Sequence, residues 1–227
     1  GYFYNDGASA IVEDIYLLSK YIKNRFNDLP LYLLGHSMGS LIVRNYIQKY
    51  DYEIDGLIIC GSPSYNKLTK VGKVVCKLFM VVKDERYCSK LMQKMFFGAF
   101  NKRFDKQNEW ICSDRNIVDA YNQDPLCTFI FTINGFYNLL TLIQRTYQPI
   151  DYSINSELPI LFISGRDDPC LINEKAFKQA VNHIKNNGYQ DVNVILFDKM
   201  RHEILNEQNK QEVYNSIINF LGAGDGR

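Results

Sequence analysis

The sequence lacks several features that would assign it to a specialised class. It has no apolar run long enough to span a membrane as a helix, and its formal net charge of +1 gives no general case for nucleic-acid binding. None of its six cysteines lies within ten residues of the next, which excludes the C-x-x-C pairs of zinc and redox sites. We interpret them as free thiols of a cytoplasmic protein and expect no metal, no cofactor and no nucleic-acid partner.

Helical periodicity and short apolar runs alternate along much of the chain. Amphipathic helices are predicted over residues 8–26, 40–50, 176–186 and 207–221. Short apolar runs, which we interpret as buried strands, occupy residues 31–34, 57–60, 158–163 and 192–197. Because strands that are apolar on both faces form parallel sheets with helices on each side, the sequence predicts an α/β fold.

A segment of different character separates the second and third predicted strands. Residues 67–106 hold eleven basic and three acidic side chains, and residues 62–150 hold eight of the fourteen phenylalanines. A basic, aromatic-rich helical insertion in an α/β protein is typical of a lid. We therefore predict a discontinuous core (1–61 and 151–221), a helical lid (62–150) and a flexible tail (222–227).

The residues from Gly35 to Gly39 match the pattern G-x-S-x-G, which places Ser37 on a sharp turn between a strand and a helix. The two glycines are expected to let neighbouring backbone approach the turn. The motif occurs often by chance, but here an apolar run precedes it and an amphipathic segment follows it, as a nucleophile elbow requires. Ser37 is then the candidate nucleophile, and the N–H of Met38 is the candidate donor to an oxyanion.

A serine nucleophile needs a histidine base and a carboxylate that orients it. Of the three histidines, His36 lies inside the elbow and His183 lies on a polar-leaning helix, whereas His202 follows the fourth predicted strand. The carboxylate is expected after the third strand, where Asp167 and Asp168 compete. Glu203 is a further candidate because it adjoins His202. It is a weaker one, since a charged side chain in a loop is more readily explained as solvated or structural.

These motifs together resemble the lid-bearing α/β-hydrolases, a family that includes monoacylglycerol lipases, lysophospholipases and serine aminopeptidases. The resemblance rests on GHSMGS (35–40), SGRDDP (164–169) and RHEILNE (201–207), with support from residues 110–114 and from DPLC (124–127). It implies an α/β-hydrolase fold with a mainly parallel sheet and a helical lid. It also implies that Asp168 is the triad acid and His202 the base.

The sequence departs from this family at its beginning. The family draws a second oxyanion donor from a loop that carries a His-Gly motif and follows an earlier strand. Only thirty residues precede the strand that leads to Ser37, and they contain no His-Gly. We therefore expect the first strands of the sheet to be missing, either because the chain is a fragment or because the gene product is shortened.

The resemblance and the composition of the insertion indicate the substrate. We expect an ester or a monoacyl lipid, cleaved by a triad through an acyl-enzyme, with Phe129 and Phe131 lining the acyl site. The basic lid predicts transient contact with an anionic membrane surface. Two other readings remain open, an aminopeptidase-type serine hydrolase and a truncated, non-catalytic protein of the same fold.

Overall fold

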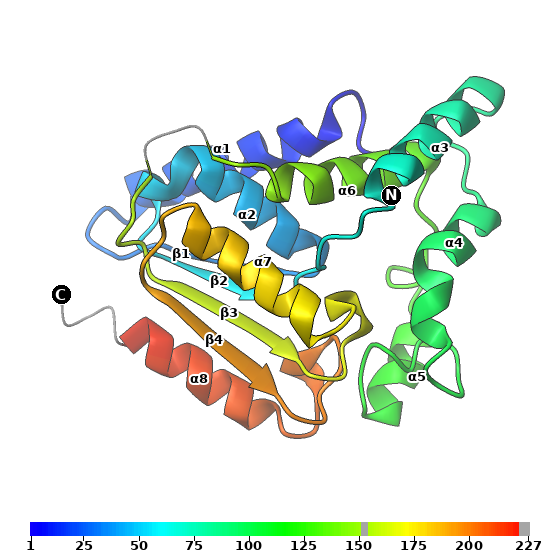
Figure 1. Ribbon diagram of the computed structural model, residues 1–227. Helices are drawn as coiled ribbons and strands as arrows, with labels where there is room; N and C mark the ends of the chain where they lie inside the picture. Colours follow the sequence, from blue (N-terminus) through cyan, green and yellow to red (C-terminus); the bar gives the residue numbers. More distant parts are fainter. Residues whose placement is uncertain (151–153, 223–227) are drawn as a thin grey trace.

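A computed structural model describes residues 1–150 and 154–222 of the protein (Figure 1). The helices are α1 (Gly7–Arg25), α2 (Met38–Tyr50), α3 (Thr69–Val82), α4 (Lys90–Asn101), α5 (Arg115–Gln123), α6 (Ile133–Thr146), α7 (Glu174–Asn186) and α8 (Lys210–Gly222). The strands are β1 (Tyr32–His36), β2 (Gly56–Cys60), β3 (Ile160–Gly165) and β4 (Val192–Phe197). Short 3₁₀ turns follow at Asp51–Glu53, Pro169–Leu171 and Ile204–Asn206.

The four described strands form one parallel sheet in the order β1-β2-β3-β4. Gly35 pairs with Ile59 across β1 and β2, and Ile59 pairs with Phe162 across β2 and β3. The arrows of Figure 1 accordingly point the same way, so the loops that carry the sequence motifs leave the sheet along one edge. The predicted α/β architecture is confirmed, and each predicted strand and helix is present within a few residues.

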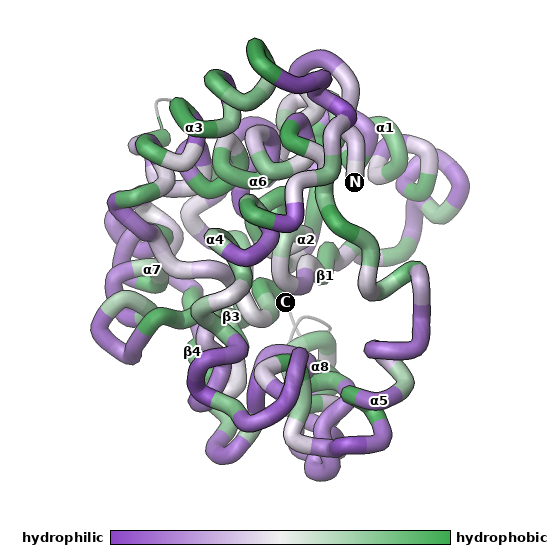
Figure 2. The backbone as a smooth tube through the Cα atoms, turned by 90° about the vertical axis from the view of Figure 1, so that its right-hand side faces the viewer, coloured by the Kyte–Doolittle hydropathy of each residue, from purple (hydrophilic) through white to green (hydrophobic). Residues whose placement is uncertain are grey.

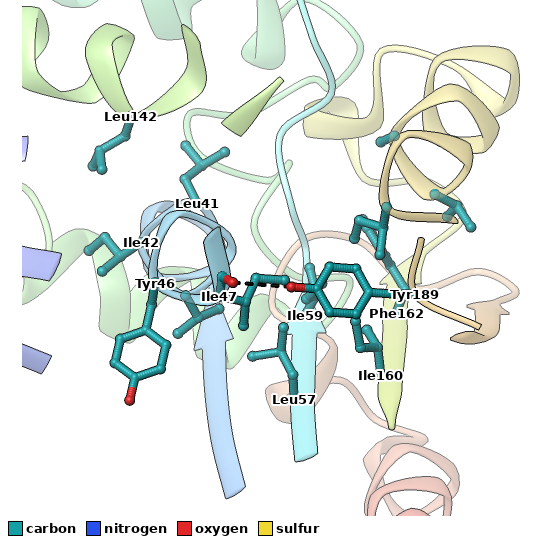
Figure 3. Packing of buried hydrophobic residues seen from close by; sticks show 14 of the residues in the cluster. Leu41, Ile42, Tyr46, Ile47, Leu57, Ile59, Leu142, Ile160, Phe162 and Tyr189 are labelled. Carbon is teal, nitrogen blue, oxygen red and sulfur yellow. Dashed lines mark hydrogen bonds between the residues drawn. The ribbon is translucent and has the colours of Figure 1, made fainter. Parts of the chain in front are cut away.

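One face of the sheet packs against α2 and α7, and α1 and α6 pack in turn on α2. Ile47 of α2 lies beside Leu57 and Ile59 of β2, and these side chains are buried (Figure 3). The hydroxyl of buried Tyr189 donates to the carbonyl of Ile47 at 3.1 Å, which satisfies the polar end of a large core side chain. This cluster holds the helix that follows Ser37 firmly against the sheet.

The other face of the sheet packs against α8. Ile58 and Ile163 lie there with Val213 of α8, and all three are buried. The two outer strands differ from the expectation that every strand is covered on both faces, because Leu34 of β1 and Val194 of β4 are exposed. An outer strand has one neighbouring strand instead of two, so fewer side chains surround it than surround β2 or β3.

Helices α3 to α6 lie between β2 and β3 in the chain. In Figure 1, α3, α4 and α5 line the side toward which the strand arrows point, whereas α6 lies over α2. Thr132 starts α6 by accepting a hydrogen bond from the N–H of Gly135 at 3.0 Å. Since Leu142 of α6 belongs to the main core cluster, the last helix of the predicted lid also forms part of the packing over the sheet.

The last described helix runs slightly past its predicted end. Gly222 is the last residue of α8, one residue beyond the predicted helix, and the remainder of the predicted tail lies outside the described residues, as does the start of the predicted core segment at 151–153. Helix ends are the boundaries that sequence patterns define least well.

All six cysteines are free thiols. None of the described helices combines the length and the apolar run needed to cross a bilayer.

Candidate active site

Ser37 occupies a strained turn between β1 and α2. Its backbone has φ 55° and ψ −119°, a conformation that is costly for any residue except glycine. The N–H of Ser37 donates to the carbonyl of Cys60 on the neighbouring strand at 3.0 Å and so anchors the turn. A Cβ on Gly35 would lie 2.4 Å from the carbonyl oxygen of Gly39, whereas a Cβ on Gly39 would meet nothing within 4 Å. Of the two motif glycines, only Gly35 is required by close backbone approach.

The structure brings Ser37, His202 and Asp168 together in one hydrogen-bonded chain. His202 Nε2 lies 2.9 Å from Ser37 Oγ, and His202 Nδ1 lies 2.9 Å from Asp168 Oδ2. Asp168 also accepts hydrogen bonds from the N–H of Cys170 at 2.8 Å and from the hydroxyl of Ser164 at 3.3 Å. These donors fix the carboxylate so that it faces His202.

The environment of His202 sets its proton affinity. The imidazole is buried, and burial by itself lowers the pKa of a histidine. The negative charge of Asp168 and its hydrogen bond to Nδ1 act in the opposite direction and prevail, so the pKa of His202 lies well above its ordinary value. A carboxylate in this position favours the imidazolium that forms when the ring takes a proton from a serine.

The competing candidates lie in other positions. Asp167 is exposed, so of the two adjacent aspartates only Asp168 reaches the histidine. His36 Nε2 donates to the backbone carbonyl of His202 at 3.1 Å, and Glu203 lies 3.8 Å from His36 Nδ1. His183 is on α7, where its ring faces the end of α6.

Met38 is the first residue of α2. The first N–H groups of a helix have no acceptor within the helix, and the helix dipole gives this end a partial positive charge. The N–H of Met38 therefore lies beside Ser37 at a place suited to stabilise a developing oxyanion.

A segment that sequence reasoning did not assign runs beside the histidine loop. The N–H of His202 donates to the carbonyl of Trp110 at 3.4 Å, and the N–H of Glu203 donates to the carbonyl of Ile111 at 2.7 Å. The indole ring of Trp110 lies 5.1 Å from the imidazole ring of His202. We call residues 109–113 the strap, because they hold one side of the histidine loop.

Two charged side chains of the RHEILNE motif fasten the strap. Arg201 Nη1 donates to the carbonyls of Glu109 at 2.5 Å and Cys112 at 3.0 Å. Buried Glu207 accepts from the N–H of Arg201 at 2.8 Å, from the N–H of Ser113 at 2.9 Å and from the Ser113 hydroxyl. The motif suggested both residues, but only the fold shows what they bind.

The predicted acyl-site phenylalanines lie among other aromatic side chains of the insertion between β2 and β3. Phe129 stacks on Phe131 at 5.4 Å, and Phe131 packs against Phe136 in the cluster between α3, α4 and α6. The ring that lies beside His202 from the insertion is Trp110. The role of Phe129 and Phe131 in binding an acyl chain stays a prediction.

Asp168, Cys170 and His202 are side chains of the kinds that bind metals. Their ligand atoms lie within 4.8 Å of one another, and all three residues are buried. Burial raises the pKa of the Cys170 thiol to about 11, so the thiol keeps its proton at neutral pH and is a poor metal ligand there. The hydrogen bond between Asp168 and His202 suits proton transfer better than a metal centre.

Comparison with known proteins relates this geometry to a family. Residues 3–209 match the family described as serine aminopeptidase S33. The chain is 25% identical over 204 residues to phospholipase YtpA of Bacillus subtilis (strain 168), covering 87% of this chain and 70% of that protein. It is 24% identical over 213 residues to a monoacylglycerol lipase of Mycolicibacterium smegmatis, covering 94% of this chain and 69% of that protein.

Two further matches extend the comparison. The crystal structure of a thermostable carboxyl esterase from Bacillus coagulans superposes with a TM-score of 0.82 at 25% identity, covering 93% of this chain and 70% of that one. An abhydrolase domain-containing protein of Dictyostelium discoideum is 25% identical over 199 residues, which are 86% of this chain and 19% of that protein. The family match over most of the chain, together with the confirmed fold, shows that the protein belongs to the serine aminopeptidase S33 family of α/β-hydrolases.

Proposed function

We propose that this chain is a serine hydrolase that cleaves the carboxylic ester of monoacyl lipids, such as monoacylglycerols or lysophospholipids. The observation that carries the proposal is the hydrogen-bonded path from Ser37 Oγ through His202 to Asp168, with 2.9 Å at each step. The matches to proteins named phospholipase, monoacylglycerol lipase and carboxyl esterase support ester chemistry. The cytoplasmic location expected from the free thiols stays a prediction.

The first half of the reaction transfers the acyl group to the protein. Ser37 Oγ attacks the ester carbonyl while His202 Nε2 takes the hydroxyl proton, and Asp168 stabilises the resulting imidazolium. The carbonyl oxygen becomes an oxyanion, which the N–H of Met38 stabilises. When the carbon–oxygen bond of the ester breaks, His202 returns its proton to the departing alkoxide, and an acyl-Ser37 ester remains.

The second half repeats the same steps with water. His202 Nε2 takes a proton from the water that attacks the acyl-Ser37 carbonyl, and the proton then passes to Ser37 Oγ as the fatty acid leaves. The indole ring of Trp110 packs beside the ring of His202, with 5.1 Å between the centroids.

Labelling with a fluorophosphonate probe tests the proposal directly. We expect the protein to be labelled and to hydrolyse p-nitrophenyl esters, and the Ser37→Ala variant to lose both properties. Ser216→Ala is the matched control, because Ser216 lies half-buried on α8 and its hydroxyl donates to the carbonyl of Glu212. Labelling that is equally strong in Ser37→Ala, or absent from all three proteins, would overturn the assignment of the nucleophile.

Substrate choice separates the ester reading from the aminopeptidase reading. We expect hydrolysis of p-nitrophenyl acyl esters and of monoacylglycerol, and no comparable release of p-nitroaniline from aminoacyl anilides. Faster turnover of the anilides would favour the aminopeptidase reading. Binding of lipid without Ser37-dependent turnover of either substrate would favour the non-catalytic reading.

The outer face of α3 supports the proposed contact with a membrane. Apolar side chains recur at helical spacing along it and are 56–86% exposed; they are Val71, Val74, Leu78, Val81 and Val82. Figure 2 shows the hydrophobic colouring of α3 at the upper border of the molecule. Lys70, Lys73 and Lys77 lie on the same helix. An apolar helix face beside basic side chains fits the surface of an anionic lipid layer.

Vesicle binding tests this contact. We expect the protein to sediment with phosphatidylcholine vesicles that contain an anionic lipid, and to bind less as the salt concentration rises. Binding that ignores both the anionic lipid content and the salt would contradict an electrostatic contact through the basic insertion.

A further inference from the structure

Arg44 carries a buried positive charge that no described carboxylate neutralises. Its side chain lies on α2 and is 2% exposed. Nη1 donates to Ser62 Oγ and to the Tyr147 hydroxyl, each at 3.1 Å, whereas buried Nη2 donates to no acceptor. None of the ion pairs found in residues 1–150 and 154–222 includes Arg44. Burying an unpaired charge costs folding free energy, so a nearby anion would stabilise this guanidinium.

A second unsatisfied donor lies in the adjacent loop. The hydroxyl of Ser64 is buried and has no partner, two residues after the serine that accepts from Arg44. The Tyr147 hydroxyl donates to the carbonyl of Pro63 at 2.9 Å and so ties this loop to the same group of residues. Four buried side-chain polar atoms lack a partner in the described part of the chain, and two of them belong here. Native proteins leave few such atoms, so these two mark the surroundings of Arg44 and the adjacent loop as rich in unused hydrogen-bond donors.

A cavity of about 460 Å³ opens beside Tyr147. The start of α3, the end of α6 and one face of α7 form its walls. Its polar lining consists of Lys70, His183, two tyrosines and three glutamines, and no described carboxylate lines it. The cavity therefore offers hydrogen-bond donors and positive charge, with no negative group among the described residues to satisfy them.

Tyr147 connects the buried charge to this cavity. The Arg44 guanidinium lies over the tyrosine ring at 4.6 Å, and the same ring forms part of the cavity wall. The ring of His183, which also lines the cavity, packs against that of Tyr147 with 5.4 Å between the ring centroids. Burial lowers the pKa of His183, and the positive charge of Arg44 lowers it further. The charge of Arg44 thus acts across one aromatic ring, where water screens it weakly.

We propose that this cavity is a binding site for a phosphate group. Lys70 and the glutamine amides would contact the phosphate oxygens, and Arg44 would supply the balancing charge from behind Tyr147. A phosphate combines several acceptor oxygens with up to two negative charges, which suits a cavity lined by hydrogen-bond donors better than a neutral ligand does. Arg44 is not among the lining residues, and its charge acts on the cavity through the ring of Tyr147. None of Ser37, Asp168 and His202 lines the cavity, so the site is separate from the proposed catalytic centre.

Thermal unfolding and calorimetry with inorganic phosphate test the proposal. We expect phosphate to raise the melting temperature of the wild-type protein and to leave that of Arg44→Met nearly unchanged. The difference between the two melting temperatures should therefore widen as the phosphate concentration rises. Lys70→Gln should bind phosphate at least about tenfold more weakly. Lys178→Gln, an exposed position on α7 outside the cavity lining, is the matched control and should bind as the wild type does.

Competition experiments identify the molecule that carries the phosphate group, and two further variants test the cavity without Arg44. Competition by a short-chain lysophosphatidate would assign the site to a lipid headgroup, whereas tighter binding of a soluble phosphomonoester would assign it to a small metabolite. If Arg44→Met does not fold, Lys70→Gln and His183→Gln still report on the cavity. Equal stabilisation of the wild type, Lys70→Gln and Lys178→Gln by phosphate, or no binding at millimolar phosphate, would overturn the proposal.

Discussion

The strap and the outer face of α3 belong to the same insertion but meet the rest of the molecule in opposite ways. The strap is joined to the histidine loop by backbone hydrogen bonds and by buried Glu207. The face of α3, by contrast, presents apolar side chains to solvent, with Val81 86% exposed. One part of the insertion is built into the candidate active site, and the other part has a surface suited to a partner outside the protein.

This difference teaches that an inserted segment need not be mobile or fixed as a whole. A segment with several buried hydrogen bonds opens only at a considerable cost, whereas a helix with an exposed face can change partners without breaking such bonds. We therefore expect substitutions along the strap to affect turnover and stability, and substitutions on the outer face of α3 to affect lipid binding alone.

The largest effect on turnover is expected at Asp168, the carboxylate that is hydrogen-bonded to His202. Asp168→Asn should lower kcat by roughly 10⁴-fold, because the amide no longer holds His202 in the correct tautomer or stabilises its charge. The exposed neighbour provides the control, since Asp167→Asn should keep the wild-type rate. Similar losses in both variants would place the orienting carboxylate elsewhere.

The pH profile of the same variant tests the electrostatics. The wild-type kcat/KM should rise with pH through the pKa of His202, because only the neutral ring takes a proton, and the midpoint should lie above the ordinary histidine value of 6.5. The charge of Asp168 is the largest of the effects that oppose burial, so its removal should move the midpoint of Asp168→Asn to lower pH. An unchanged midpoint would argue against the pairing.

The next largest effect, on the stability of the protein, is expected at Glu207, which binds the strap. Glu207→Ala leaves the N–H groups of Arg201 and Ser113 without their acceptor, and should lower the free energy of unfolding by about 3 kcal/mol. Urea unfolding measures this change, and kcat for a soluble ester should fall as well because the histidine loop loses its support. Glu212→Gln, exposed on α8, is the matched control.

A moderate effect is expected at Arg201. Arg201→Lys keeps the charge but removes the guanidinium Nη1 that donates to the carbonyls of both Glu109 and Cys112, so the free energy of unfolding should fall by about 1–2 kcal/mol. The KM for a short soluble ester should change less than kcat. A change confined to KM would mean that the strap binds substrate and does not position His202.

The smallest effect on the folded protein is expected on α3. Leu78→Asp should change the free energy of unfolding by no more than about 0.5 kcal/mol, because the side chain is exposed. Hydrolysis of a soluble ester should remain at the wild-type rate while binding to anionic vesicles is lost. Loss of soluble-ester turnover in this variant would remove the distinction between the strap and α3.

The sequence predicted the sheet and the site more completely than the surroundings of the site. Short apolar runs identified all four described strands, and the spacing of the motifs placed Ser37 and His202 on loops at one edge of the sheet. The choice between Asp167 and Asp168 rested on family resemblance, because neighbours in a loop differ only in the direction in which they point. The strap was not predicted, since its partners lie far away in the chain and many of its bonds are made by backbone atoms.

Arg44 shows a second limit of sequence patterns. A charged residue within an amphipathic helix is read as solvent-facing, yet α6 and the loop after β2 cover this one completely. Gly39 shows the reverse case. The motif predicted that neighbouring backbone approaches this glycine closely, but a Cβ at this position would meet nothing within 4 Å. Both depend on what packs against the helix, which local spacing does not encode.

The amino-acid sequence by itself determined the α/β order of the elements, the strained turn at Ser37 and the types of side chain available for catalysis, because these follow from local periodicity and turn chemistry. Only the tertiary structure decided that Asp168 faces His202, that residues 109–113 support the histidine loop, and that Arg44 is buried beside a cavity without a described carboxylate. Those outcomes depend on packing between segments distant in the chain, where burial and the positions of charges are set by the whole fold.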